Sequence, residues 1–105
     1  MEVVLHINST LINVLSELRT ASINSTPENI KATMDKYDML FLGEKFNCIY
    51  SIELAHSLKN FFNINISHDE LLTLIPIACS SLNMKFEELI ALGNPSTHCY
   101  SITLF

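Results

Sequence analysis

The sequence predicts an α+β fold that is mostly helical, with about five short helices and a small sheet of two or three strands formed by the terminal segments. Apolar residues recur at helical spacing through the middle of the chain, whereas both ends carry short segments of strand-like pattern. The 105 residues are 49% hydrophobic, which is enough material for one packed core. We therefore expect a single domain over residues 1–105.

The N-terminal segment predicts a strand followed by a helix. Val3, Leu5 and Ile7 alternate with Glu2, Val4 and His6, which favours a strand over residues 3–7. Ser9 can then cap a helix, since a serine side chain satisfies a free backbone N–H at a helix start. The apolar stripe of this helix is Leu11, Val14, Leu15 and Leu18.

The clearest helix start in the chain is Thr26-Pro27-Glu28. Thr26 is a capping residue, Pro27 suits the first helical position, and Glu28 complements the helix dipole. Apolar residues then recur at helical spacing, and Gly43 suits the left-handed position after the end. The recurring positions are Ile30, Met34, Tyr37 and Phe41.

The next part of the chain predicts two helices. Residues 46–50 are a short strand or a buried connector, and Ser51 can cap the helix that follows. Ser67 and Glu70 have the spacing of a capping box and open another helix. Pro76 lies inside that helix, so we expect a kink or two abutting short helices. The apolar faces are Leu54 and Leu58 with Phe61 or Phe62, and then Leu71, Leu74, Ile75, Ala78 and Leu82.

The C-terminal part predicts a fifth helix and a strand. Asn83 can cap a helix that contains Phe86, Leu89 and Ile90 and stops at 93–95. Residues 98–105 alternate, so that Tyr100, Ile102 and Leu104 share one face of a strand. We expect this tail strand to pair with the N-terminal strand.

Composition excludes several functional classes. Six Lys and Arg residues stand against eleven Asp and Glu residues, and the net charge of −5 argues against direct binding of nucleic acid. The most apolar window, residues 71–79, is too short to span a bilayer, so we expect no membrane association. The N-terminus lacks the pattern of a signal peptide, which predicts a cytoplasmic location. Two glycines cannot build a phosphate-binding loop.

The chain carries no local motif for catalysis or metal binding. The three cysteines and four histidines include no Cys-x-x-Cys and no His-x-x-x-His spacing, and we expect neither a metal nor another cofactor. Cys79 falls on an apolar helix face, where a thiol is inert. Glu87 and Glu88 are adjacent on the predicted helix and do not face each other. A Cys/His enzyme or metal-binding domain is therefore our third hypothesis, and we predict no enzymatic activity.

One segment suggests a second hypothesis. Residues 71–89, LLTLIPIACSSLNMKFEEL, resemble the closing segment of phage-repressor-type helix-turn-helix domains. The resemblance covers about a fifth of the chain and implies a transcriptional regulator derived from that fold. Lys59 and Lys85 are the only Lys or Arg residues from position 46 onward, against five acidic residues, so a DNA-reading surface is missing.

Our leading hypothesis is a non-enzymatic protein–protein interaction domain. The open edge of the tail strand and a surplus of aromatic side chains both favour a protein partner, and we expect a homodimer. Phe61 and Phe62 cannot both point into one core, so one of them is expected near the surface. The predicted interface residues are Phe61, Phe62, Tyr100, Ile102, Leu104 and Phe105.

Size and composition suggest how such a domain would act. A small acidic chain rich in Ile and Asn is typical of a low-GC bacterium or its phages. We expect a phage- or mobile-element-type regulator or inhibitor that docks on a bacterial host protein, for example one of the replication or transcription machinery. Its acidic surface would meet a basic face of that protein.

Overall fold

The computed structural model describes residues 2–90 and 98–105, and this part of the chain forms four helices and one three-stranded antiparallel sheet. The helices are α1 (Glu2–Ile23), α2 (Ile30–Tyr37), α3 (Ser51–Asn60) and α4 (His68–Leu82), and the strands are β1 (Cys48–Tyr50), β2 (Lys85–Ile90) and β3 (His98–Thr103). The predicted α+β, mostly helical class is confirmed, with four helices in place of about five. None of these helices combines the length and apolar character needed to cross a membrane.

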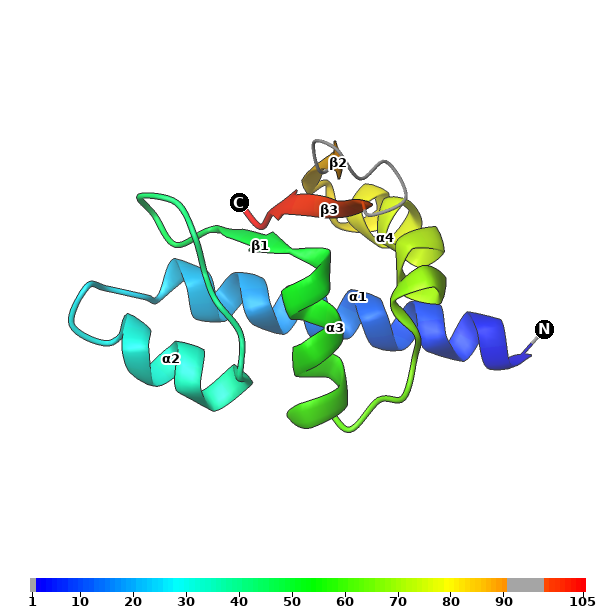
Figure 1. Ribbon diagram of the computed structural model, residues 1–105, viewed down its shortest axis with the longest axis horizontal. Helices are drawn as coiled ribbons and strands as arrows, with labels where there is room; N and C mark the ends of the chain where they lie inside the picture. The colour runs from blue at the N-terminus through cyan, green and yellow to red at the C-terminus, as the bar shows by residue number, and fades with distance from the viewer. Residues whose placement is uncertain (1, 91–97) are drawn as a thin grey trace.

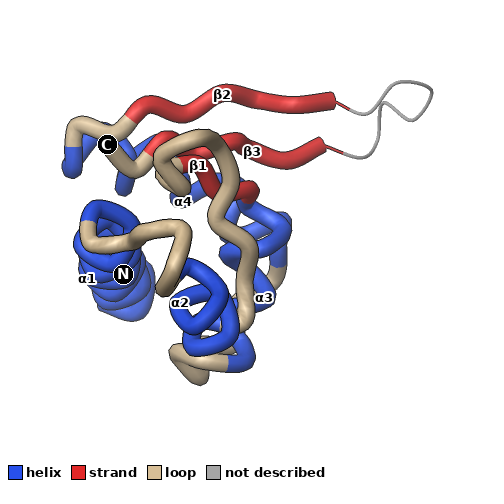
Figure 2. The backbone as a smooth tube through the Cα atoms, turned by 90° about the vertical axis from the view of Figure 1, so that its left-hand side faces the viewer, coloured by secondary structure: helices blue, strands red, loops and turns tan. Residues whose placement is uncertain are grey.

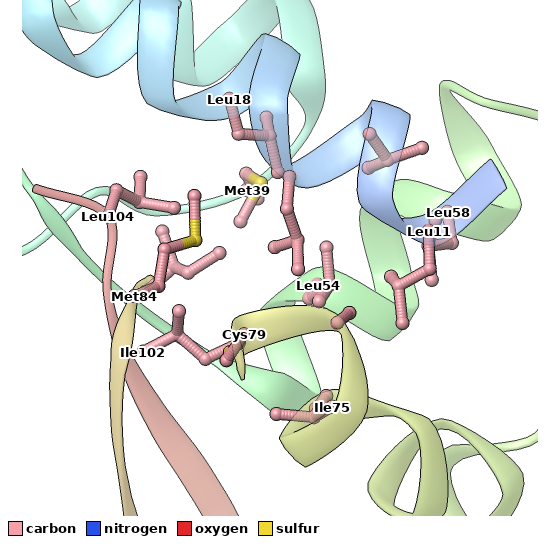
Figure 3. Close-up of a cluster of buried hydrophobic side chains, with 14 of the residues drawn as sticks. Leu11, Leu18, Met39, Leu54, Leu58, Ile75, Cys79, Met84, Ile102 and Leu104 are labelled. Carbon is pink, nitrogen blue, oxygen red and sulfur yellow. The ribbon is translucent and has the colours of Figure 1, made fainter. Parts of the chain in front are cut away.

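The sheet lies across one side of the helices (Figures 1 and 2). The hydrophobic core takes its buried side chains from the helices and from β1 and β3. The predicted stripe of α1 is buried. The predicted faces of α3 and α4 are buried at Leu54, Leu58, Leu71, Ile75 and Ala78, whereas Leu74 and Leu82 are half-buried. Ile49 of β1 and Ile102 of β3 are directly opposite each other and close the core from the sheet side. Figure 3 shows Leu18, Leu54 and Cys79 converging with Ile102 and Leu104.

The predicted N-terminal strand is wrong, because residues 3–7 belong to α1, which begins at Glu2. A short run of β-branched residues fits either a strand or a helix. The structure shows why no strand forms there. The tail strand β3 is already paired with β1 on one side and β2 on the other, so β3 has no free edge with which the N-terminal segment could pair.

The predicted bounds of the second helix are wrong, because α2 begins at Ile30, after Thr26-Pro27-Glu28, and ends before Phe41. The Thr26 Oγ1 accepts a hydrogen bond from the Asn29 N–H at 3.2 Å, and the Asn29 Oδ1 accepts one from the Thr26 N–H at 2.7 Å, so residues 26–29 form a turn. The last helical residue is Tyr37, and the residue after it, Asp38, has a left-handed φ of 53°. Phe41 is therefore buried from the non-helical segment after α2, and Gly43, with φ of 88°, lies in the turn that leads to β1.

The capping box that opens α4 is confirmed on its serine side. The Ser67 Oγ accepts a hydrogen bond from the Glu70 N–H at 3.2 Å and lies 3.1 Å from the Glu70 Oε1. Pro76 lies within one continuous helix, so the alternative of two abutting helices is not realised. Proline lacks an N–H, and the Leu72 carbonyl therefore loses its usual partner four residues on.

The predicted fifth helix is wrong, because residues 85–90 form the strand β2. Asn83 does not cap a new helix but ends α4 in a left-handed conformation, with φ of 59°. The Met84 N–H donates to the Cys79 carbonyl at 2.8 Å and the Asn83 N–H to the Ser80 carbonyl at 3.3 Å, which is a Schellman motif. Asparagine is suited both to a helix N-cap and to this left-handed position, so the residue type alone does not show whether Asn83 begins a helix or ends one.

This ending also removes the basis of the helix-turn-helix resemblance. In that motif a second helix would follow the turn, whereas here a strand follows α4 and pairs with β3 from Lys85 to Ile90. The Gly93-Asn94-Pro95 stop lies outside the described residues. The predicted tail strand is confirmed as β3, but it is the central strand and its edge is not open.

Candidate protein-docking surface

The six predicted interface residues do not form one surface. Ile102 and Leu104 are 0% and 1% exposed and belong to the core, so they are not available to a partner. Tyr100 packs its ring against Phe86 on the sheet, with centroids 5.5 Å apart. Phe105 is exposed at the C-terminus, where its carbonyl accepts a hydrogen bond from the Asn47 Nδ2 at 2.7 Å.

Phe61 and Phe62 lie at the end of α3 in an aromatic cluster. The Tyr37 ring is 4.8 Å from Phe61 and 5.9 Å from Phe62, and it holds α2 against α3. Phe61 is exposed and Phe62 is half-buried, which confirms that one of the two lies near the surface. The Tyr37 hydroxyl donates to the Glu17 Oε2 at 2.9 Å. Burial and then the Glu17 carboxylate raise the pKa of Tyr37 from 10.0 to about 12, so the ring is a neutral structural group.

Beside this cluster, a groove of about 340 Å³ runs between α2 and α3, and we call it the α2–α3 groove. Leu40, from the segment after α2, is 49% exposed, and Ile52, from the first turn of α3, is 50% exposed. The residues that line the groove are Met34, Asp35, Asp38, Met39, Leu40, Ile52, Glu53 and His56. They include four apolar side chains and three carboxylates, but no Lys or Arg.

Hydrogen bonds fix the walls of this groove. The Glu53 Oε1 accepts a bond from the Leu40 N–H at 2.9 Å, which ties the segment after α2 to α3. The Asp38 Oδ2 lies 3.0 Å from the His56 Nε2 and accepts a bond from the Asn60 Nδ2 at 3.0 Å. These hydrogen bonds hold Leu40 and Ile52 in place beside the carboxylates of the groove, and the carboxylates favour a cationic group on a partner.

Sequence reasoning did not identify Leu40 or Ile52. The signal for Ile52 is its place off the apolar stripe of α3, on the same side as the exposed His56 and Lys59. Leu40 lies in the non-helical segment after α2 and is exposed, whereas its neighbours Met39 and Phe41 are buried. Finding it required knowledge that α2 ends at Tyr37.

One serine lies beside a histidine as a nucleophile lies beside its base, but its side chain is buried in the fold. The Ser51 Oγ lies 3.0 Å from the His68 Nε2, a distance suited to a nucleophile and its base. Ser51 is 0% exposed, and its oxygen also accepts a bond from the Tyr100 N–H at 2.9 Å. It therefore joins the starts of α3 and α4 to β3, and it is not the helix cap that the sequence suggested, because α3 begins at Ser51 itself.

The cysteines are free thiols in separate places. Cys79 is buried in the core, as predicted, and burial raises the pKa of its thiol from 9.0 to about 11. The Cys48 Sγ lies 3.1 Å from the Ser101 Oγ, on the side of the sheet opposite the core residue Ile49. Among the described residues, no three His, Cys, Asp or Glu side chains are placed to hold a metal ion together.

No protein-family model, curated protein or solved structure matches the chain.

Proposed function

We propose that this chain is a non-enzymatic protein-interaction domain that binds its partner through the α2–α3 groove. The observation that carries the proposal is the pair Leu40 and Ile52, each about half exposed at 49% and 50%, in one hollow with three carboxylates. Two large aliphatic side chains from different elements, exposed beside one another and rimmed by polar groups, are typical of a docking site.

Apolar contact would supply most of the affinity. Full burial of an aliphatic side chain stabilises by roughly 1.5–3 kcal/mol, and these two side chains are already half-buried. Covering both of them would therefore contribute about 1.5–3 kcal/mol before the partner's own apolar surface is counted. A partner that inserts one or two large apolar side chains fits the size of the hollow.

The carboxylates define which partner is accepted. Asp35, Asp38 and Glu53 line the groove without a neighbouring Lys or Arg in the lining, so a cationic side chain next to the apolar anchors is favoured. An acidic partner would meet like charges and be rejected. On this proposal the chain is a small regulator or inhibitor, of the type that phages and mobile elements encode, which covers a basic and apolar face of a larger bacterial protein.

The proposal of a non-enzymatic role is supported by the position of the reactive side chains. Ser51 and Cys79 are both 0% exposed, and the Ser51 oxygen is engaged by the Tyr100 N–H as well as by His68. A substrate would have to break the contact between α3, α4 and β3 to reach the serine.

The test is affinity capture from a low-GC bacterial lysate with nuclease treatment. The wild-type chain is expected to retain a stoichiometric protein, and Ile52→Lys to lose it. Ile77→Lys is the matched control, because Ile77 is a helical isoleucine that is 52% exposed on α4, outside the groove lining. Equal capture by both variants, or recovery of nucleic acid alone, would contradict the groove as the docking site.

A further inference from the structure

Strand β2 is a long edge strand at the margin of the sheet. Its six residues pair with β3 on one side, and no described residue pairs with its other side. Figure 2 shows β2 as the outermost element of the molecule, with β3 and β1 following toward the helices. The opposite edge strand, β1, has three residues, and Cys48 at its start is already bridged to Leu42. The outer edge of β2 is therefore where unpaired N–H and C=O groups are exposed.

The side chains of β2 form a charge pattern that is complementary to itself. Lys85 and Glu87 are opposite Thr103 and Ser101 on one face of the sheet, and both are exposed. Phe86 points to the other face, opposite Ile102, and is 38% exposed with its ring against Tyr100. Along β2, a positive and a negative charge on one face of the sheet thus alternate with an aromatic ring on the other face.

We propose that β2 pairs with the β2 of a second copy of this chain, antiparallel and with the two-fold axis at Phe86. In an antiparallel pair, directly opposite residues point to the same face of the sheet. When a two-fold axis normal to the sheet relates two copies of one strand, one residue must therefore lie directly opposite its own copy, with the axis between the two. With the axis at Phe86, Lys85 of each copy faces Glu87 of the other, and the two Phe86 rings are adjacent. The two sheets join into one of six strands.

The charges of β2 select this register over its neighbours. An axis at Lys85, Glu87 or Glu88 would set that side chain opposite its own copy, and facing like charges destabilise strand pairing. An axis at Leu89 would leave Lys85 and Glu87 without an opposite charge. The Phe86 register gains two ion pairs and also extends the Phe86–Tyr100 cluster across the junction.

A charge swap tests the proposal by sedimentation velocity over a range of protein concentrations. The wild-type chain is expected to dimerise, and Glu87→Lys or Lys85→Glu to raise the dimer dissociation constant about tenfold or more, since each turns two attractive pairs into two repulsive ones. The double variant Lys85→Glu/Glu87→Lys restores opposite charges and should recover the dimer. Glu44→Lys, an exposed residue outside the sheet, carries the same charge change as Glu87→Lys and should leave dimerisation unchanged.

Three results would overturn the proposal. These are a wild-type chain that stays monomeric at the highest concentration, a dimer that is indifferent to both single swaps, and a double variant that stays monomeric. Lys85 and Glu87 are both exposed, so the swaps spare the core, and circular dichroism checks that each variant is folded. Neither residue lines the α2–α3 groove, and failure here is therefore distinguishable from failure of the groove proposal.

Discussion

Two serines of α3 are completely buried, and their hydroxyl groups have opposite surroundings. Ser51 is 0% exposed and bonded to both His68 and the Tyr100 N–H, whereas Ser57 is 0% exposed and its Oγ has no partner among the described residues. A buried hydroxyl that is bonded stabilises the fold, and one that is unbonded costs free energy. The sequence shows two serines on one helix and does not distinguish them.

We therefore predict that Ser51→Ala lowers the free energy of unfolding by about 1–3 kcal/mol, because it leaves the Tyr100 N–H and the His68 imidazole without their shared partner. Ser57→Ala is the matched control and should leave stability unchanged or raise it. Urea unfolding of the three proteins measures the difference. Equal losses in both variants would show that the Ser51 hydrogen bonds do not carry the effect.

A second prediction at the residue scale concerns alkaline pH. Burial raises the pKa of Cys79 from 9.0 to about 11, and burial with Glu17 raises the pKa of Tyr37 from 10.0 to about 12. The unfolded chain releases these protons at lower pH than the native chain, so stability falls as the pH rises from about 9 to about 12. The urea concentration at the midpoint of unfolding should decrease across this pH range. The decrease relative to neutral pH should be smaller in Tyr37→Phe, because this variant lacks the titrating hydroxyl group.

At the scale of elements, apolar periodicity identified the helices that bury a full stripe. The predicted face of α1 is buried, as are most positions of the predicted faces of α3 and α4, and the alternation of residues 98–105 identified β3. The errors fall where local patterns are ambiguous. The pattern of residues 3–7 is compatible with both a helix and a strand, and Asn83 is suited both to the start and to the end of a helix. Pairing with β3 makes residues 85–90 a strand, and that long-range contact has no local signature.

The role of Asn83 gives a prediction for α4. Asparagine tolerates the left-handed φ of 59° at this position, and glycine adopts it without strain. Alanine is disfavoured there, because it has a Cβ but no polar side-chain group to bond with the backbone. Asn83→Gly should keep or raise the melting temperature, and Asn83→Ala should destabilise by about 1 kcal/mol. Thermal unfolding followed by circular dichroism compares the two. A more stable alanine variant would contradict a left-handed end to α4.

At the scale of the whole molecule, neither candidate surface could be read from the sequence. The sequence predicts partner-binding residues on the tail strand and at Phe61 and Phe62, because exposed strand edges and adjacent aromatic residues favour association. The topology buries Ile102 and Leu104 and moves the open edge to β2. The α2–α3 groove depends on how two helices and the segment between them pack, which the spacing of apolar residues does not specify.

A partner bound in the α2–α3 groove must cover the segment around Leu40 and the first turn of α3. The most direct measurement is amide hydrogen exchange of the chain, free and in complex with the captured protein. We predict slower exchange in residues 38–42, where the Leu40 N–H is bonded to the Glu53 side chain, and in residues 51–56. The Ile77 region of α4 should exchange equally in both states. Protection confined to α4 or to the sheet, with residues 38–42 unchanged, would contradict docking at the groove.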